Sequence, residues 1–406
     1  MEEKDLSGKQ KIEFAQARMP VLARAVEDSL SHHSLGGKKV AMTIHLEAKT
    51  AVLASYLKTL GADVYVAGSN TETTQDDVAQ ALAEQGVNVF AKHGCTQQEQ
   101  EKFLRNLVVH EPDFIIDDGG DLVALLDNYP EFRAKVLGGC EETTTGVTRL
   151  KAREKEGSLH FPMIAVNDSP MKKLFDNCFG TGQSTMDGIL RTTNMKVCGK
   201  NFVVAGYGHC GKGIAMRARG LGANVIVTEV NPVKAYQAMQ EGYRVMPMMQ
   251  ACLIGDFFVT ATGDINVIDN RHFGSLKDGA ILCNAGHFDV EVHMDQLRRY
   301  ASSHREVRKN IEEFVLPSKK KIFVLAQGKL VNLAAADGHP IEIMDLSFSL
   351  QFLSVLYLAT SYGKMEKKLY PVPPQVDRYV AKAALSADGV KIDTLTSEQE
   401  KYLQSM

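Results

Sequence analysis

The sequence predicts an α/β protein in which two doubly wound parallel sheets form separate domains. Length and composition support this fold class, because 406 residues that are 44% hydrophobic and 23% charged are enough for two or three domains. The order of segments supports it as well. Short β-branched runs alternate with amphipathic segments in two blocks, one at about 38–161 and one after 194, and this alternation is typical of βαβ units around a parallel sheet.

The first block contains three such repeats. Its expected elements are, in order, a strand at 40–44, a helix at 50–60 that ends at Gly61, a strand at 64–67, a helix capped by Thr73 or Thr74, and a strand at 114–116. Ligands of open parallel sheets bind beyond the carboxyl ends of the strands. His45 and Asp118 follow two of these strands directly, so both lie where a site is expected.

The second block has enough strand-forming sequence for a six-stranded Rossmann domain. Its expected elements are a helix ending near Asn194, strands at 202–205 and 225–228 around a helix at 214–221 that ends at Gly222, and strand-rich runs at 257–263, 280–287 and 321–325.

A glycine-rich turn joins the first strand of this block to its helix. The turn has the form G-x-G-x-x-G at Gly206, Gly208 and Gly211. Alone, this pattern also fits an ordinary tight turn, but its place between a strand and a helix is typical of a dinucleotide site. Glycine lets a pyrophosphate approach the backbone, and the helix N-terminus faces its negative charge.

The acidic residue at the tip of the next strand indicates which dinucleotide is bound. Glu229 stands 18 positions after Gly211, close to the offset of about 20 at which a carboxylate binds the adenosine ribose. Glu229 would repel a 2′-phosphate, and no arginine follows it directly. The sequence therefore predicts NAD rather than NADP.

Charge and targeting signals exclude several classes of partner. The chain has 46 basic and 49 acidic residues and no long run of like charges, which disfavours nucleic acid and anionic membranes. The short basic clusters at 319–321 and 367–368 are interpreted as solvated loops and helix ends. The N-terminus has no apolar stretch typical of a signal peptide, so we expect a cytoplasmic protein.

Cysteine usage fits the same compartment. The seven cysteines form no C-x-x-C pair and no spacing that suits zinc, so we expect reduced thiols and no metal site. Cys210 has two interpretations: a thiol made more acidic by the helix N-terminus, or a small residue that fills the turn.

Segments throughout the chain resemble the adenosylhomocysteinase family. The matching segments are 44–51, 117–122, 141–147, 166–169, Lys172, 175–177, 204–208, 286–289, 331–334 and 337–340. The resemblance implies a substrate domain at 1–181 plus 339–365, an NAD domain inserted at 182–338 and a tail at 366–406. Gly180–Gly182 and Asp337–Gly338 become hinge candidates, with ordinary turns as the alternative.

The family's reaction explains why these polar residues are needed. The resemblance implies reversible hydrolysis of S-adenosyl-L-homocysteine: NAD transiently oxidises the 3′-carbon, a base removes the C4′ proton, homocysteine is eliminated, water adds, and the ketone is reduced again. Lys172 and Asp176 would act at the 3′-hydroxyl, with the pKa of Lys172 depressed. Asp118 would be the C4′ base, and His45 and His287 would serve the leaving sulfur and the entering water.

Separately, each of these residues also has a structural interpretation. The two histidines could be core residues whose hydrogen bonds are satisfied, and Asp118 could be a helix cap; the motif set as a whole favours the catalytic roles.

The resemblance also implies binding roles. Glu142, Asn177 and His339 would contact the substrate. The residues expected near NAD are Thr143, Thr144, Thr145, Gly208, His209, Cys210, Gly211, Lys212, Gly213, Glu229, Ala285, Gly286, His287, Asn332 and His339. We assign no specific role to His209.

Two other functions remain possible from the sequence. A plain NAD-linked dehydrogenase would produce reduced cofactor, and a catalytically silent homologue would only bind NAD. The completeness of the catalytic set favours the hydrolase. The resemblance is to the short form of the family, without its C-terminal Lys/Tyr tail, and it implies a homotetramer. Thr181 stands where many relatives carry cysteine.

Glu47 and Lys49 differ from the residues usual in adenosine-specific relatives. A protonated lysine can only donate hydrogen bonds, which suits the carbonyl oxygen of hypoxanthine. Glu47 could accept from its N1–H. The sequence therefore leaves open an S-inosyl-L-homocysteine hydrolase with the same mechanism. A surface pair without a ligand role is the alternative.

Overall fold

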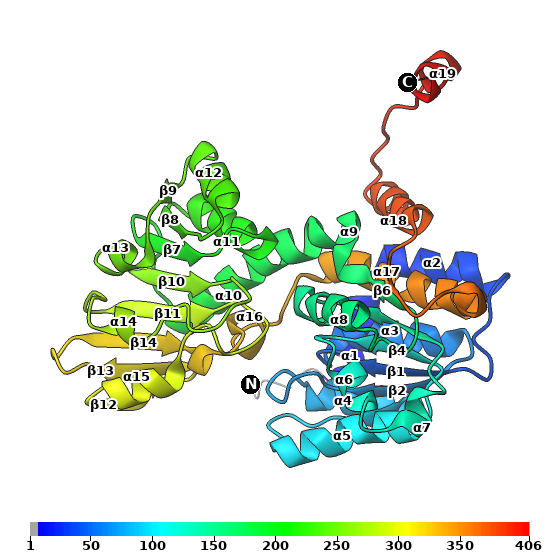
Figure 1. Cartoon of the computed structure of the whole chain (residues 1–406), viewed down its shortest axis with the longest axis horizontal. Helices are drawn as coiled ribbons and strands as arrows, with labels where there is room; N and C mark the ends of the chain where they lie inside the picture. Colours follow the sequence, from blue (N-terminus) through cyan, green and yellow to red (C-terminus); the bar gives the residue numbers. More distant parts are fainter. Residues whose placement is uncertain (1–6, 406) are drawn as a thin grey trace.

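The computed structural model describes residues 7–405 and consists of two α/β domains that lie side by side (Figure 1). Helix α10 (Thr181–Thr193) leads from the first domain into the second. The chain returns through the segment before α17 (Ile341–Ser361), a long helix of the first domain. The second domain therefore lies between two segments of the first along the chain.

The first domain is built on a seven-stranded parallel sheet. Its strand order is β15-β6-β5-β4-β1-β2-β3. The strands are β1 (Lys39–Thr43), β2 (Asp63–Ala67), β3 (Asn88–Phe90), β4 (Phe114–Asp117), β5 (Gly138–Glu141), β6 (Met163–Ala165) and β15 (Leu369–Pro371). The strands expected at 40–44, 64–67 and 114–116 are confirmed as β1, β2 and β4. Apolar residues from both faces of this sheet form the domain core.

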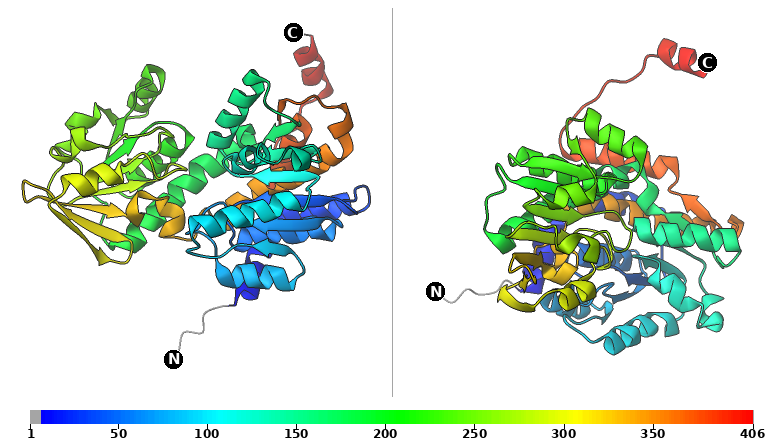
Figure 2. Two further views of the ribbon diagram at one scale, coloured as in Figure 1. Left: turned by 60° about the horizontal axis from the view of Figure 1, so that its bottom comes forward. Right: turned by 60° about the vertical axis from the view of Figure 1, so that its left-hand side comes forward.

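Helices cover both faces of this sheet (Figures 1 and 2). They are α1 (Gly8–Gln16), α2 (Pro20–Leu30), α3 (Ala48–Thr59), α4 (Asp76–Glu84), α5 (Gln97–Val109), α6 (Asp121–Leu126), α7 (Pro130–Arg133), α8 (Thr144–Glu156), α9 (Pro170–Lys173), α17 and α18 (Pro374–Ala387), with short helices η1 (Val166–Asp168), the π-helix η2 (Phe175–Gly180) and η4 (Tyr362–Lys364). The predicted threonine cap of α4 is wrong. Gln75 is the N-cap residue and makes no side-chain cap. Thr74 and Thr73 lie one and two residues before it, and the Thr73 hydroxyl contacts His45 instead.

The second domain contains the expected six parallel strands in the order β14-β11-β10-β7-β8-β9. Its strands are β7 (Asn201–Ala205), β8 (Asn224–Thr228), β9 (Arg244–Val245), β10 (Phe257–Thr260), β11 (Ala280–Asn284), β12 (Ser303–Arg308), β13 (Ile311–Val315) and β14 (Lys321–Leu325). The expectation of a purely parallel sheet is wrong here, because β12 and β13 add an antiparallel hairpin at the β14 edge. Every residue of β12 is exposed, so this strand lacks the apolar run on which the prediction relied.

The helices of the second domain complete its two layers. They are α10, α11 (His209–Gly220), α12 (Pro232–Gln240), α13 (Met248–Cys252), α14 (Asn270–Phe273), α15 (Met294–Tyr300), η3 (Ala326–Gly328) and α16 (Val331–Ala334). Helix α11 begins at His209, so it starts directly after Gly208 and earlier than the sequence predicted.

Part of the segment predicted as a C-terminal tail is built into the first domain. Strand β15 pairs with β6 at the edge of the sheet, and α18 packs against α2 and α17. The prediction missed this because β15 is only three residues long and contains a proline, which is tolerated on an edge strand. Only α19 (Ser397–Gln404) projects away from the body of the molecule (Figures 1 and 2).

Helix α17 is the one helix of the described chain that is both long and strongly apolar. The segment Ile341–Lys364 is long and apolar enough to cross a membrane by length and composition, but 67% of its apolar window is buried inside the protein. Its side chains pack in the core of the first domain. A core helix therefore explains its composition.

Candidate active site between the two domains

The predicted catalytic residues follow the carboxyl ends of the strands in the first domain. His45 follows β1, Asp118 follows β4 and Glu142 follows β5. Lys172 lies in α9 and Asp176 in η2, both after β6. Because these strands are neighbours in one parallel sheet, their carboxyl ends lie along a single edge.

Asp118 lies between two histidines from opposite domains. Its carboxylate is 3.4 Å from His45 Nε2 and 4.0 Å from His287 Nδ1. The Ser69 hydroxyl donates to the same carboxylate at 2.9 Å, and the Thr73 hydroxyl contacts His45 Nδ1 at 2.8 Å. Burial lowers the pKa of His45, although Asp118 opposes this. His45 is therefore neutral at pH 7 and able to exchange a proton.

Gly119 allows His287 to approach this group. Its φ of +105° is strained for any residue with a side chain, and a Cβ atom at Gly119 would lie 2.8 Å from His287 Nε2. The glycine therefore serves the contact between the domains as well as the turn after β4.

Lys172 is the centre of a second buried cluster. Its Nζ lies 2.8 Å from Asn177 Oδ1, 3.1 Å from Asp176 Oδ1 and 3.2 Å from Glu142 Oε1. Burial alone lowers the pKa of Lys172, but the carboxylates of Asp176 and Glu142 outweigh it, and the net pKa is raised. The expectation of a partly neutral Lys172 is wrong, because two acids surround the amine.

The acids of this cluster differ in charge state. Burial acts to raise the pKa of Asp176, but Lys172 and His339 hold it below its usual range. His339 Nδ1 lies 3.0 Å from Asp176 Oδ1, and the Ser347 hydroxyl donates to Oδ2 at 2.6 Å. Burial raises the pKa of Glu142 to about 7, against the effect of Lys172. Asp176 is thus an anion, while Glu142 can change its charge near neutrality.

The glycine-rich turn of the second domain has room for a pyrophosphate. Gly206 has a φ of +94°, and a Cβ at Gly211 would lie 2.0 Å from the Gly206 carbonyl oxygen. A Cβ at Gly208 would meet nothing within 4 Å. Packing inside the protein thus requires glycine at Gly206 and Gly211, and the space over Gly208 is open for a ligand at the N-terminus of α11.

Gly213, the second glycine of α11, brings the glycine-rich turn close to the Lys172 cluster. A Cβ at Gly213 would lie 1.8 Å from the Cys178 carbonyl oxygen, and Cys178 belongs to the same η2 helix as Asp176. A dinucleotide at the turn would therefore lie beside the catalytic cluster.

Several other residues predicted for the dinucleotide have partners in the protein. Glu229, at the end of β8, accepts from the N–H groups of Tyr207, Val230 and Asn231 at 2.7–2.8 Å. These bonds offset burial and lower the pKa of Glu229, so an anion is held rigidly at the end of β8. Buried Asn332 donates to Ser184, but its Oδ1 has no partner. An unpartnered buried oxygen fits a donor on a ligand, such as a carboxamide N–H.

The three predicted threonines lie at the N-terminus of α8, and other predicted residues lie after β11 or in the first turn of α11. Thr143 caps α8 through a bond from the Gly146 N–H, the Thr144 hydroxyl donates to Asn167, and Thr145 is half-buried in the first turn of α8. Ala285 and Gly286 follow β11 and lead to His287, while His209, Cys210 and Lys212 belong to the first turn of α11.

Two side chains in this turn differ from expectation. The Lys212 ammonium bonds Gln237 and lies over the Tyr207 ring, so only its backbone faces the turn. Burial raises the pKa of Cys210, which contradicts the acidic-thiol interpretation.

Glu47 and Lys49 form a buried ion pair. The Lys49 Nζ lies 2.8 Å from Glu47 Oε2 and donates to the carbonyl oxygen of Asp337 at 3.2 Å. Each residue is only 6% exposed, so the interpretation as a surface pair is wrong. Glu47 is also the N-cap of α3. The pair thus links the first domain to the segment that returns from the second.

The sequence analysis missed the residues that hold the catalytic groups in place. Ser69, Thr73, Ser347 and Gln351 each contact a predicted catalytic or substrate residue. Ser347 and Gln351 are four residues apart on α17, a spacing that puts them on one helix face. Polar residues with this spacing in an otherwise apolar helix were the available signal.

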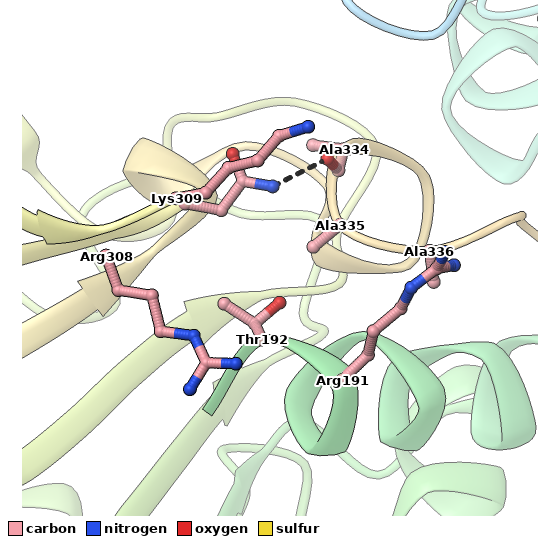
Figure 3. Close-up of a pocket in the computed structure, with 8 residues that line it drawn as sticks. Arg191, Thr192, Arg308, Lys309, Ala334, Ala335 and Ala336 are labelled. Atoms are coloured by element: carbon pink, nitrogen blue, oxygen red, sulfur yellow. Dashed lines mark hydrogen bonds between the residues drawn. The ribbon is translucent and has the colours of Figure 1, made fainter. Parts of the chain in front are cut away.

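A separate cavity of about 330 Å³ lies beside the segment that connects the domains (Figure 3). Arg191, Arg308, Lys309 and the alanines at 334–336 line it. Asn310 donates to the Ala334 carbonyl at 3.1 Å. None of the predicted catalytic residues lines this cavity, so it is distinct from the candidate active site.

Comparisons with known proteins agree with this geometry. A family model described as S-adenosyl-L-homocysteine hydrolase matches residues 2–128, and its NAD binding domain matches 177–338. The adenosylhomocysteinase of Aquifex aeolicus is 52% identical over 99% of this chain and 98% of its own, and that of Thermococcus kodakarensis is 51% identical over 98% and 95%. The S-inosyl-L-homocysteine hydrolase of Methanosarcina mazei is 52% identical over 99% and 98%. The chain therefore belongs to the S-adenosyl-L-homocysteine hydrolase family, and its second domain is the NAD-binding domain of that family.

Proposed function

We propose that this enzyme reversibly hydrolyses S-adenosyl-L-homocysteine to adenosine and homocysteine with bound NAD. The observation that carries the proposal is Asp118, a buried carboxylate between histidines from both domains. The test is to incubate the purified protein with S-adenosylhomocysteine and to assay homocysteine and nucleoside. Product without net reduction of NAD supports the hydrolase, net reduction would indicate a dehydrogenase, and no product from adenosyl or inosyl substrate would leave only a silent homologue.

The two domains divide the ligands between them. Residues 1–181 and 339–365 bind the substrate, and 182–338 bind NAD, with closure about Gly180–Gly182 and Asp337–Gly338. In support, the glycine turn, the Glu229 carboxylate and the free oxygen of Asn332 all suit NAD. Thr143–Thr145 and His339 complete the nicotinamide side. NAD, when bound, supplies reversible oxidation at the 3′-carbon.

The Lys172 cluster orients the 3′-hydroxyl. As an ammonium ion Lys172 donates to substrate oxygens, whereas the anionic Asp176 accepts the hydroxyl hydrogen. Lys172 can take up a proton itself only after substrate has displaced part of its acidic surroundings. Asn177 and Glu142, which both contact the amine of Lys172, hold the ribose hydroxyls.

Asp118 removes the C4′ proton once the neighbouring carbon is a ketone. His45 and His287 lie on either side of Asp118, so they can deliver a proton to the sulfur and take one from the entering water. Closure of the domains brings His287 to this position and excludes bulk water from the ketone.

The second candidate substrate is S-inosyl-L-homocysteine. The observation in its favour is the buried ammonium of Lys49, a pure donor that suits a hypoxanthine carbonyl. In an adenine complex Glu47 would instead accept from the amino group. Side-by-side kcat/KM values on the two substrates distinguish them, and inosyl activity below detection would remove this candidate.

The enzyme works in the cytoplasm as a homotetramer. Its seven cysteines are free, as a reducing compartment requires. Helix α12 exposes the apolar side chains of Val233, Tyr236 and Met239, spaced three residues apart on one face, which suits contact with a second copy of the chain. Light scattering should report four copies, and a stable monomer would contradict this assembly.

A further inference from the structure

Glu141 is a buried carboxyl group at the end of β5 to which the proposed reaction gives no role. It is completely inaccessible to solvent and stands directly opposite Asp117 in the register of β4 and β5. Its Oε1 accepts three hydrogen bonds, from the Gly119 N–H at 2.9 Å, the Thr143 N–H at 2.9 Å and the Thr143 hydroxyl at 2.8 Å.

These donors belong to two different loops of the active site. Gly119 directly follows Asp118, and Thr143 directly follows Glu142. A single oxygen atom therefore joins the loop that carries the proposed C4′ base to the loop that carries a proposed ribose ligand. Such shared hydrogen bonds fix the relative position of catalytic side chains.

The first turn of helix α8 packs against the Glu141 carboxyl group. A Cβ at Gly146, in the first turn of α8, would lie 2.1–2.3 Å from the carboxyl atoms of Glu141. Thr143 both donates to Glu141 and accepts from the Gly146 N–H at 3.0 Å. The hydrogen bonds and the packing against α8 thus fix the position of the Glu141 carboxyl group, and the missing side chain of Gly146 leaves room for it.

The other oxygen of this carboxyl indicates its charge state. Glu141 Oε2 is buried and has no hydrogen-bond partner. Burial, and then the neighbouring Asp117, raise the pKa of Glu141 well above its usual value. A neutral acid costs less than an unpartnered anion in a dry interior, so Glu141 adds no second negative charge beside Asp118.

We propose that Glu141 is a positioning residue that holds Asp118 in place for C4′ proton abstraction through its bonds to Gly119 and Thr143. The inference rests on the proposed hydrolase reaction. It assigns Glu141 an indirect role, because the side chain is inaccessible to solvent and bonds only within the protein. A merely structural Glu141 would affect stability and every reaction step alike.

The test compares two partial reactions in Glu141→Gln and Glu141→Met. Gln keeps an accepting oxygen and carries no charge, whereas Met has similar volume and only a weakly accepting thioether. In D₂O, one measurement follows 3′-oxidation by the absorbance of the reduced cofactor and the other follows deuterium uptake at C4′. Glu141→Met should slow C4′ exchange about 100-fold and 3′-oxidation less than about threefold, because small displacements of a catalytic group have effects of this size. Glu141→Gln should keep both rates near wild type.

Gly146→Ala is an independent second variant in case the Met variant fails to fold. It displaces the Glu141 carboxyl while leaving every proposed catalytic side chain unchanged, and C4′ exchange should again fall more than oxidation. Asp345→Leu is the matched control. Asp345 is a buried carboxylate that accepts from the Val21 and Leu22 N–H groups, so its loss should lower the melting temperature without changing the ratio of the two rates.

Three outcomes would overturn the inference: equal loss of both rates, unchanged C4′ exchange in Glu141→Met and Gly146→Ala, or a Gln variant as slow as Met. Failure of the hydrolase proposal would be visible separately, because wild type would then show neither partial reaction.

Discussion

The two domains contribute different kinds of groups to the site: the second domain contributes mainly backbone (the backbone half), and the first contributes mainly side chains (the side-chain half). The second domain presents backbone: open space over Gly208 and the N-terminus of α11, with one rigid carboxylate at Glu229. The first domain presents buried charged side chains, such as Lys172 and Asp118, that other side chains hold in place. Local sequence determines the first kind of site, whereas long-range packing determines the second.

The largest expected effect is on the side-chain half. Asp118→Asn should still permit 3′-oxidation, visible as enzyme-bound reduced cofactor, but homocysteine release should fall by about 10²- to 10⁴-fold, the usual contribution of a general base. Rapid-mixing absorbance and a thiol assay measure the two steps. Homocysteine released at the normal rate would show that another group is the C4′ base.

Glycine substitutions test the backbone half. Gly211→Ala places a Cβ 2.0 Å from the Gly206 carbonyl oxygen and should destabilise the domain by about 1–3 kcal/mol, as overpacking does. Gly208→Ala meets no protein atom within 4 Å, so it should fold normally but bind NAD more weakly. Calorimetry of unfolding and of NAD binding separates the two effects.

The matched control for these variants is Gly220→Ala at the other end of α11. A Cβ there also meets nothing within 4 Å, and NAD binding should not change. If Gly208→Ala and Gly220→Ala bind NAD equally well, the space over Gly208 is not the pyrophosphate site.

Glu229→Ala tests the carboxylate that the second domain offers to NAD. Hydrogen bonds to a charged group contribute about 1.5–3 kcal/mol, so NAD should bind roughly 10- to 100-fold more weakly. Isothermal titration measures this change, with Glu229→Gln expected to lie between wild type and alanine. An unchanged dissociation constant would contradict the ribose assignment.

The charge state of Glu142 predicts a pH dependence confined to the side-chain half. Burial raises the pKa of Glu142 to about 7, against the effect of Lys172. Below that pH the protonated acid binds ribose hydroxyls less well, so nucleoside affinity should rise with pH by up to about tenfold per unit and level off above 7. Glu142→Gln should abolish the dependence, whereas a profile that survives in this variant would assign it to another group.

The smallest effect concerns the purine. Lys49→Gln replaces a pure donor with a side chain that can also accept, and the ratio of inosyl to adenosyl kcat/KM should fall about fivefold, the value of one hydrogen bond. Steady-state kinetics on both substrates measure the ratio. If the wild-type enzyme lacks inosyl activity and the kcat/KM ratio is the same in Lys49→Gln, Lys49 does not recognise the purine base.

The same contrast explains what the sequence could predict. The glycine turn, the six parallel strands and Glu229 follow local patterns and were predictable. The raised pKa of Lys172 was not, because it depends on Asp176 and Glu142 together outweighing burial, and Glu142 comes from a distant part of the chain. Ser347 and Gln351 lie on a helix far along the chain, and only packing brings them to Asp176 and Glu142. The hairpin of β12 and β13 was missed because β12 is an exposed polar strand and carries no apolar signal.

Deuterium incorporation during turnover tests the central claim most directly. The wild-type enzyme is incubated with S-adenosylhomocysteine in D₂O, and the released adenosine is examined by mass spectrometry and NMR. The account predicts deuterium at C4′, equal amounts of adenosine and homocysteine, and no net reduction of NAD. Homocysteine released with adenosine that carries no deuterium at C4′ would contradict it, because the thioether would then be cleaved without the proton abstraction assigned to Asp118.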